Sequence, residues 1–226
     1  MSLTLYLHPL ASFCHKVMIA LYESGTPFTP QIVDLMDEGS AASHLARWPV
    51  GKIPVLHDAE RGQLVPETSI IIEYLETYHP GARPMLPGDA EARLQARLWD
   101  RFFDLYVSVP MQKIVIDRIR PAESRDPFGV DEARQTLRTA YSMVNGQTAL
   151  GTWAVGEAFS LADCAAAPAL FFASIVEPIP AELTGLKGYL DGLLDRPSVR
   201  RVYRDAAPYF SMFPYRDAMP DKYLAL

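Results

Sequence analysis

The sequence has no run of basic residues, no long apolar run and almost no cysteine. With a formal net charge of −6 at pH 7 and no basic patch, it lacks the usual features of a nucleic-acid-binding or anionic-membrane-binding protein. No stretch approaches the roughly 18 uninterrupted apolar residues of a membrane span, and the start lacks the basic and apolar regions of a signal peptide. We therefore expect neither nucleic acid nor membrane as a partner.

Cysteine and histidine also lack the spacing of metal ligands. The two cysteines, Cys14 and Cys164, are too few for a disulfide framework and form no Cys-x-x-Cys pair. The five histidines are scattered, with no His-x-x-x-His pair. We expect no metal site, and a reducing compartment, hence the cytoplasm.

What is present is an ordinary globular composition over 226 residues, 49% of them hydrophobic, which suits one large or two small domains. Before about residue 80, strand-like and helix-like segments alternate. Pro30 argues for an edge position of the second strand, because it cannot donate to a ladder. Strands are expected at 3–8, 28–35, 53–57 and 63–65, and helices at 15–24, 40–47 and 67–78.

The resulting order, βαβαββα, implies a parallel pair joined by a right-handed crossover, followed by an antiparallel hairpin. This is the thioredoxin-like arrangement, and we assign it to residues 1–80. A Gly- and Pro-rich linker follows at 81–89. Residues 90–226 carry no convincing strand and form an all-helical domain. Its helices are expected at 90–118, where Pro110 is a candidate kink, and at 131–150, 160–174, 182–194 and 198–206, before an aromatic tail at 208–226.

Three local motifs carry candidate chemistry. The first joins the first strand to the first helix and contains Ser12 and Cys14. Free N–H groups and the helix dipole favour an anion at such a helix start, so a bound thiol here would have its thiolate stabilised. A serine hydroxyl at this point can donate a hydrogen bond to sulfur. The alternative is that Ser12 is only a helix N-cap.

The second motif, residues 48–56, places Pro54 at the start of a strand after a Gly-containing loop. Such a proline is a candidate cis peptide. The backbone N–H and C=O of Ile53 could then pair with an extended peptide as an added strand would. The alternative is a plain loop entering a strand.

The third motif, residues 66–75, begins a helix at Glu67 and Thr68. Thr68 is well placed to bind a carboxylate and Glu67 to bind an ammonium, so the pair suits the end group of an α-amino acid. The alternative is an ordinary charged helix start.

Together the motifs resemble the cytosolic glutathione transferase family, of bacterial type and unassigned class. The family's NPxGKVPxL and ESxAIxxYL stand here as WPVGKIPVL and ETSIIIEYL, and its FSxAD segment as FSLAD. In that last segment Ser160 and Asp163 fit a capping box, which is folding chemistry. The resemblance covers nearly the whole chain and implies glutathione as co-substrate. It also implies a homodimer, in line with the general preference for twofold assemblies.

The resemblance also assigns roles by position. Ile53 would pair with the cysteinyl part of glutathione beside cis Pro54, and Glu67 and Thr68 would hold the γ-glutamyl group. Lys52 and His44 would reach the glycyl carboxylate.

The thiol-activating group stays open. Counting forward from Pro9 selects Ser12, whereas counting back from Lys16 selects Ala11, because loop lengths differ. Cys14 is an alternative that would shift the chemistry toward thiol exchange, and backbone N–H groups alone are another. We favour Ser12.

The electrophile is expected between the two domains, against Phe103, Tyr106 and Met111 of the helix at 90–118. An aromatic row of this kind can equally be core. We expect a transferase that conjugates glutathione to hydrophobic electrophiles in detoxification. The alternatives are a glutathione-dependent thiol-disulfide oxidoreductase, peroxidase or isomerase, and a non-catalytic binding or regulatory protein.

Overall fold

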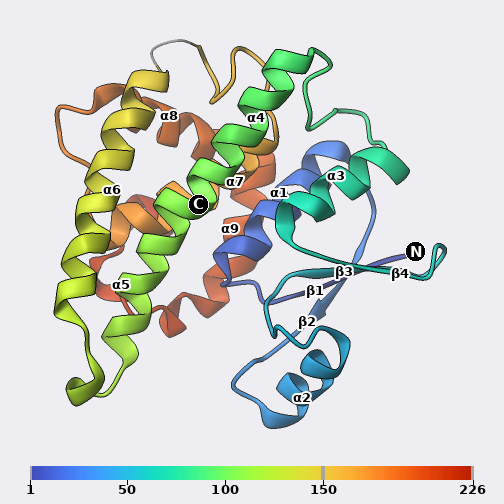
Figure 1. Cartoon of the computed structure of the whole chain (residues 1–226), viewed down its shortest axis with the longest axis horizontal. Helices are drawn as coiled ribbons and strands as arrows, with labels where there is room; N and C mark the ends of the chain where they lie inside the picture. Colours follow the sequence, from blue (N-terminus) through green and yellow to red (C-terminus); the bar gives the residue numbers. More distant parts are fainter. Residues whose placement is uncertain (1, 149–150, 225–226) are drawn as a thin grey trace. The chain divides into compact units, whose positions relative to one another are not determined.

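The computed structural model describes residues 2–148 and 151–224, and the chain divides into two compact units, Met1–Leu86 and Pro87–Leu226. The first unit combines a sheet with helices, and the second is helical (Figure 1). This confirms the predicted fold class, a thioredoxin-like α/β domain followed by an all-α domain.

The first unit holds a four-stranded sheet in the order β2-β1-β3-β4. β1 pairs with β2 in parallel, whereas β3 is antiparallel to both β1 and β4. The predicted order βαβαββα is therefore confirmed, and so is the edge position of the strand that contains Pro30. The bounds are β1 Leu3–Leu7, α1 Ser12–Ser24, β2 Thr29–Ile32, α2 Glu38–Arg47, β3 Val55–Asp58, β4 Gln63–Pro66 and α3 Thr68–Tyr78.

The alternation of β1 explains which face of the sheet is covered. Leu3, Leu5 and Leu7 are buried, while Thr4 and Tyr6 between them are partly exposed. The helices α1 and α3 pack together on one face of the sheet, and α2 lies beyond its β2 edge (Figure 1). The second strand is shorter than the expected 28–35, because the chain turns after Ile32 toward α2.

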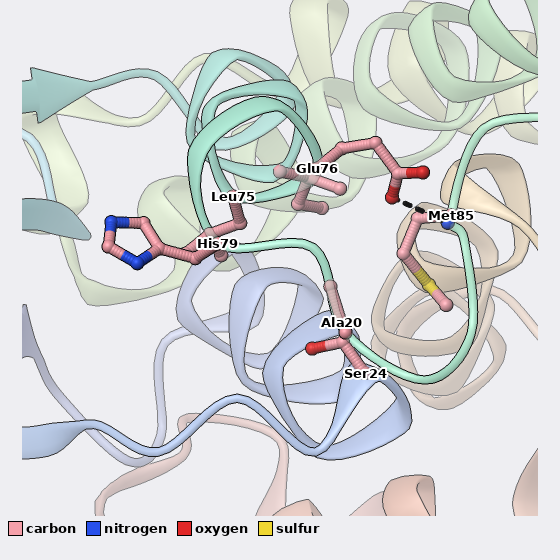
Figure 2. A pocket seen from close by; sticks show the side chains of 8 residues that line it. Ala20, Ser24, Leu75, Glu76, His79 and Met85 are labelled. Carbon is pink, nitrogen blue, oxygen red and sulfur yellow. Dashed lines mark hydrogen bonds between the residues drawn. The ribbon is translucent and has the colours of Figure 1, made fainter.

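A small cavity lies where α1 and α3 end (Figure 2). Ser24, Glu76, His79 and Met85 contribute to its lining, and the Glu76 carboxylate accepts the N–H of Met85 at 2.9 Å. The cavity volume of about 10 Å³ has room for one water molecule at most. This end of the two helices therefore offers no space for a substrate.

The second unit contains all five predicted helices, the first of them in two parts, and three short ones in the tail that the sequence did not predict. The bounds are α4 Ala90–Phe102, α5 Val109–Ile119, α6 Pro127–Gln147, α7 Leu161–Val176, α8 Thr184–Asp195, α9 Pro197–Ala206, η4 Ala207–Met212, η5 Arg216–Ala218 and α10 Asp221–Leu224, with a short 3-10 turn, η2, at Ala122–Ser124. The predicted helix 131–150 begins four residues earlier, and its last two positions lie outside the described residues.

A π-helical segment, η1 Phe103–Ser108, separates α4 from α5. Pro110 follows it in the first turn of α5. Proline has no N–H and its ring crowds the carbonyl four residues earlier, so a wider turn before it removes the conflict. The expected kink at Pro110 is thus realised as a local change of helix type.

The core of the second unit is built around α7, which is buried along nearly its whole length. The rings of Tyr203 and Tyr223 stack on Phe171 at centroid distances of 4.0 and 4.5 Å. At the start of α7, Ser160 and Asp163 form the predicted capping box, which is confirmed.

One row of apolar side chains on α4, η1 and α5 is exposed rather than buried. The row, called here the leucine row, has exposed fractions of 60% at Leu94, 57% at Leu98, 43% at Leu105, 49% at Val109 and 46% at Ile116. Phe102, on the same helix α4, is buried by contrast, at 8% exposure.

Candidate functional site

The strand register brings three loops to one edge of the sheet. Tyr6, at the end of β1, pairs with Val55 at the start of β3, and Val55 pairs with Pro66 at the end of β4. The residues after β1, before β3 and after β4 are therefore neighbours. These are the loops that carry the three sequence motifs.

The loop after β1 delivers the start of α1. Ala11 is the N-cap residue and makes no side-chain cap, and Ser12 is the first helical residue. The alternative that Ser12 is a simple N-cap is therefore wrong, since the cap position falls one residue earlier. Within the part of the chain that the structure describes, the N–H groups of Ser12 and Phe13 have no acceptor. They are available to an anion.

Ser12 is largely buried but keeps some exposed surface, whereas Cys14 keeps none. Ser12 is 8% exposed, and its hydroxyl has no hydrogen-bond partner among the described residues. Cys14 is fully buried, and burial raises the pKa of its thiol to about 12. A thiol with such a pKa stays protonated at neutral pH, and a protonated thiol is a poor nucleophile.

His15 and Lys16, which follow Cys14, hold this segment in place through hydrogen bonds. His15 is fully buried, and its Nε2–H donates to the carbonyl of Pro9 at 2.5 Å. Burial lowers the pKa of His15 to about 4, so the ring is neutral at physiological pH. The side chain of Lys16 is buried as well and donates to Ser69 of α3 at 3.0 Å. The sequence did not single out either residue.

The loop before β3 contains the cis Ile53–Pro54 peptide bond that was predicted. Gly51 has φ 71°, a backbone angle that side-chain-bearing residues rarely adopt. The N–H and C=O of Ile53 make no hydrogen bond within the described residues. An extended peptide could therefore pair with Ile53 by β-augmentation.

His44 and Lys52, the two residues expected to reach the glycyl carboxylate, differ in exposure. Lys52 is exposed, whereas His44 is fully buried. The Nε2–H of His44 donates to the Lys52 carbonyl at 2.9 Å, and its Nδ1 is buried without a partner in the described part of the chain. His44 therefore holds the backbone of the loop, and direct contact of its ring with a carboxylate stays a prediction.

The third loop starts α3 with a strained residue. Glu67 is the N-cap residue, with φ 68° and ψ 119°, and makes no side-chain cap. A non-glycine residue in this region costs about 1–3 kcal/mol and persists where the surroundings hold it, often at functional sites. Glu67 is exposed and Thr68 is 8% exposed. The exposed carboxylate of Glu67 thus lies directly before the first turn of α3, which begins at Thr68.

The predicted pocket residues of the helical unit fall into two groups. Phe103 and Met111 are buried in its core, at 0% and 3% exposure, with Phe103 packed against Trp99 and Phe102. Tyr106 is 51% exposed and packs on Phe102 at a ring distance of 5.3 Å. Phe103 and Met111 therefore belong to the core, which was the alternative to a pocket. Tyr106 is the one of the three that is exposed.

Residues 2–148 and 151–224 contain no group of three or more His, Cys, Asp or Glu side chains that could hold a metal ion. Across the same described ranges, no helix has the length and apolar character to cross a membrane.

Comparison with known proteins supports the motif reading at both ends of the chain. The glutathione S-transferase N-terminal domain family matches residues 5–83, and the glutathione S-transferase C-terminal domain family matches residues 110–197. Glutathione S-transferase GstB of Escherichia coli K12 is 26% identical over 190 residues, covering 83% of this chain and 90% of GstB. A Caenorhabditis elegans protein named probable maleylacetoacetate isomerase is 30% identical over 182 residues, covering 75% of this chain and 78% of that protein.

A solved structure has the same fold over most of its length. A glutathione S-transferase from Methylobacterium radiotolerans, in complex with glutathione sulfonate, superposes with a TM-score of 0.77 at 27% identity, covering 88% of this chain and 93% of that one. The two units define a protein with a thioredoxin-like domain followed by an all-helical one. The chain belongs to the glutathione transferase family, as its motifs indicated.

Proposed function

We propose that this protein conjugates glutathione to hydrophobic electrophiles. In the reaction the thiol loses its proton to solvent, the thiolate sulfur forms a bond to an electrophilic carbon, and a leaving group such as halide departs with its electron pair. The chain's task is to bind glutathione, lower the pKa of its thiol and hold the electrophile nearby.

The observation that carries this proposal is the meeting, at one edge of the sheet, of two sets of backbone groups without partners among the described residues and of the strained start of α3. The start of α1 offers the N–H groups of Ser12 and Phe13, the loop before β3 offers Ile53, and α3 starts at the strained Glu67. Glutathione is an extended tripeptide with a thiol in the middle and an α-amino acid group at one end. Each of these three parts matches one loop.

The roles follow from that match. Ile53 pairs through its backbone with the cysteinyl residue beside Pro54. Glu67 receives the γ-glutamyl ammonium, and Thr68 receives its carboxylate through hydroxyl and backbone N–H. The exposed Lys52 reaches the glycyl carboxylate, and we assign His44 the support of that loop through the Lys52 carbonyl.

Ser12 is the proposed thiol-activating residue. Its hydroxyl, which has no partner among the described residues, lies at the start of α1, where a hydrogen bond and the helix dipole both favour a thiolate. Cys14 is the weaker candidate, because its burial and raised pKa oppose reaction with a bound substrate.

The helical unit supplies the electrophile site in this proposal, with the half-exposed Tyr106 as its polar wall and Phe103 and Met111 as packing behind it. We also propose a homodimer. The leucine row supports it, since five exposed apolar side chains along one helix face are unusual unless a partner covers them. Cys14 and Cys164 remain thiols, which suits a cytoplasmic detoxification enzyme.

A second candidate is an isomerase that uses glutathione catalytically. The 30% identical relative named probable maleylacetoacetate isomerase favours it. Isomerisation would use the same glutathione site, adding and then expelling the thiolate without net conjugation. The two functions share the glutathione site and differ in the electrophile and in whether glutathione stays attached to the product.

Retention on immobilised glutathione and turnover of a generic aryl halide test the proposal, measured for wild type, Ser12→Ala and Cys14→Ala. We expect retention of all three proteins and loss of turnover in Ser12→Ala. Maleylacetoacetate is assayed in parallel as the isomerase substrate.

Failure of the wild-type protein to bind glutathione would exclude both functions. Binding without turnover of any electrophile would indicate a regulatory or binding protein, and loss confined to Cys14→Ala would indicate thiol exchange.

A further inference from the structure

Lys16 is a buried cation beneath the candidate glutathione site. It lies on α1, four residues after Ser12, and is 1% exposed. Removing an ammonium group from water is costly unless strong partners compensate, and lysine is rarely buried for that reason. An apolar side chain of similar size, such as methionine, would fill the same space at lower cost. A methionine at this position would lack the ammonium group and its hydrogen bond to Ser69.

The Lys16 side chain reaches the helix that follows the third loop of the site. Its Nζ donates to the Ser69 hydroxyl at 3.0 Å, and Ser69 is the second residue of α3, directly after Thr68. The bond joins two segments that are 53 residues apart in sequence. It links the helix that starts at Ser12 to the helix that starts at Thr68.

We propose that Lys16 is a positioning residue for the γ-glutamyl carboxylate of glutathione, a step that rests on the proposed function above. Through Ser69 it fixes the first turn of α3, where Thr68 presents its hydroxyl and N–H. Its positive charge also adds to the positive end of the α3 dipole, so both favour an anion at that turn. Lys16 itself does not touch the ligand.

A purely structural role for Lys16 makes a different prediction. If the side chain only joins α1 to α3, its loss weakens binding of every ligand of the site alike, or lowers stability alone. A positioning role weakens binding selectively, for ligands that carry the γ-glutamyl carboxylate. The matched probe is a glutathione analogue in which that one carboxylate is a carboxamide.

The experiment measures dissociation constants of both ligands by calorimetry for wild type, Lys16→Met, Lys16→Arg and Ser69→Ala. Lys187→Met, at a lysine of α8 with no ion pair within the described residues, controls for loss of one positive charge. In Lys16→Met we expect the Kd for glutathione to rise about tenfold and that for the analogue less than about twofold. Lys16→Arg restores most of the affinity, and Lys187→Met leaves both constants unchanged.

Equal changes for the two ligands, or no change in a folded Lys16→Met protein, overturn the proposal. If Lys16→Met does not fold, Ser69→Ala decides, with an expected rise of about threefold for glutathione alone; equal effects on both ligands there overturn it as well. Wild-type protein that binds neither ligand refutes the glutathione site itself, whereas wild-type binding with unselective variants refutes only the role of Lys16.

Discussion

The two units differ in what receives the first N–H groups of their helices. In the helical unit, the side chains of Asp89 and Asp126 cap α4 and α6, and Ser160 and Asp163 form a reciprocal box on α7. In the first unit, α1 and α3 begin without a side-chain cap, while α2 is capped by Asp37. Helix starts are thus closed where they only support the fold and left open at the edge where the three motifs meet.

The other uncapped starts of the helical unit have separate explanations. α8 has its Leu186 N–H received by the Asn145 side chain at 3.0 Å. α9 begins with Pro197, which has no N–H to satisfy. α5 continues directly from η1 and so has no free start. Among the α-helices that the structure describes with an N-cap residue, α1 and α3 thus begin without a side-chain cap and without such an explanation.

The largest expected effect is on stability, at the capped start of α7 in the helical unit. Asp163 is fully buried and accepts from the N–H of Ala154, the N–H and hydroxyl of Ser160 and the hydroxyl of Tyr189. Asp163→Ala leaves these donors without a partner and should lower the free energy of unfolding by about 3–5 kcal/mol. Urea denaturation followed by circular dichroism measures it.

The matched control is Asp195→Ala, whose exposed carboxylate pairs with Arg200. Exposed pairs contribute little, so this change should stay within about 0.5 kcal/mol. A loss below about 1 kcal/mol in Asp163→Ala would show that the box is not a major support of α7.

On the open side, Ser12→Ala should lower kcat/KM with an aryl halide about 100-fold, the usual effect of removing one donor to a developing anion. The Kd for glutathione should change little, since the backbone contacts remain. The pH–rate profile should move to higher pH, because the bound thiol loses its hydrogen-bond donor. Cys14→Ala, at a buried thiol of the same helix, serves as the comparison, and similar losses in both variants would contradict the assignment.

Closing an open start tests the comparison directly. Ala11 has φ −78° and ψ 119°, a geometry that suits an N-cap. Ala11→Asp should therefore raise stability by about 0.5–1 kcal/mol. The same carboxylate occupies an N–H group and repels a thiolate, so the glutathione Kd should rise about tenfold.

Asp89→Ala is the reverse experiment, opening the start of α4. It should cost about 1 kcal/mol in thermal or urea unfolding and leave the glutathione Kd unchanged. Should Ala11→Asp bind glutathione as tightly as wild type, the N–H groups at α1 are not part of the binding site.

The smallest expected effect is on thermal stability at acid pH, through Asp58. Burial acts to raise the pKa of Asp58, but hydrogen bonds from His79 at 2.6 Å, from Tyr74 at 2.9 Å and from the Arg61 N–H outweigh it, so its pKa lies below the ordinary value. A carboxyl with a lowered folded-state pKa stabilises the fold above its unfolded-state pKa, and this stability is lost as the pH falls through the folded-state value.

We therefore expect Tm to fall as the pH drops below about 4, by roughly 2–4 °C for each kcal/mol lost. Asp58→Asn keeps the size of the side chain and should flatten that part of the profile. Parallel profiles for the two proteins would assign the acid sensitivity to other carboxyls.

The sequence predicted the order of elements well, because the alternation of strand-like and helix-like segments and the Gly- and Pro-rich linker at 81–89 are local signals. It placed ends less well: the strand at 28–35 contracts to Thr29–Ile32, and α3 begins one residue after Glu67. The short helices after Ala206 were missed, since aromatic packing on Phe171 rather than periodicity orders that tail. The π-helical segment before Pro110 also has no periodic signature.

The site was partly predictable for a related reason. Ile53, Pro54, Glu67 and Thr68 belong to contiguous motifs, and the strand register brings them together. The choice between Ser12 and Ala11 depended on where the helix begins, which the count of loop residues left open. Lys16 was missed because lysine is usually exposed; the available signal was its spacing of three residues from the buried Ile19.

The left-handed backbone of Glu67 has a consequence for sequence variation. At φ 68° a glycine would relieve strain, at the cost of its own greater flexibility when unfolded. It would also remove the carboxylate proposed to hold an ammonium. In a library of variants scored separately for abundance and for ligand binding, Glu67→Gly should therefore rank high on the first scale and low on the second. Such a divergence distinguishes a residue kept for recognition from one kept for folding.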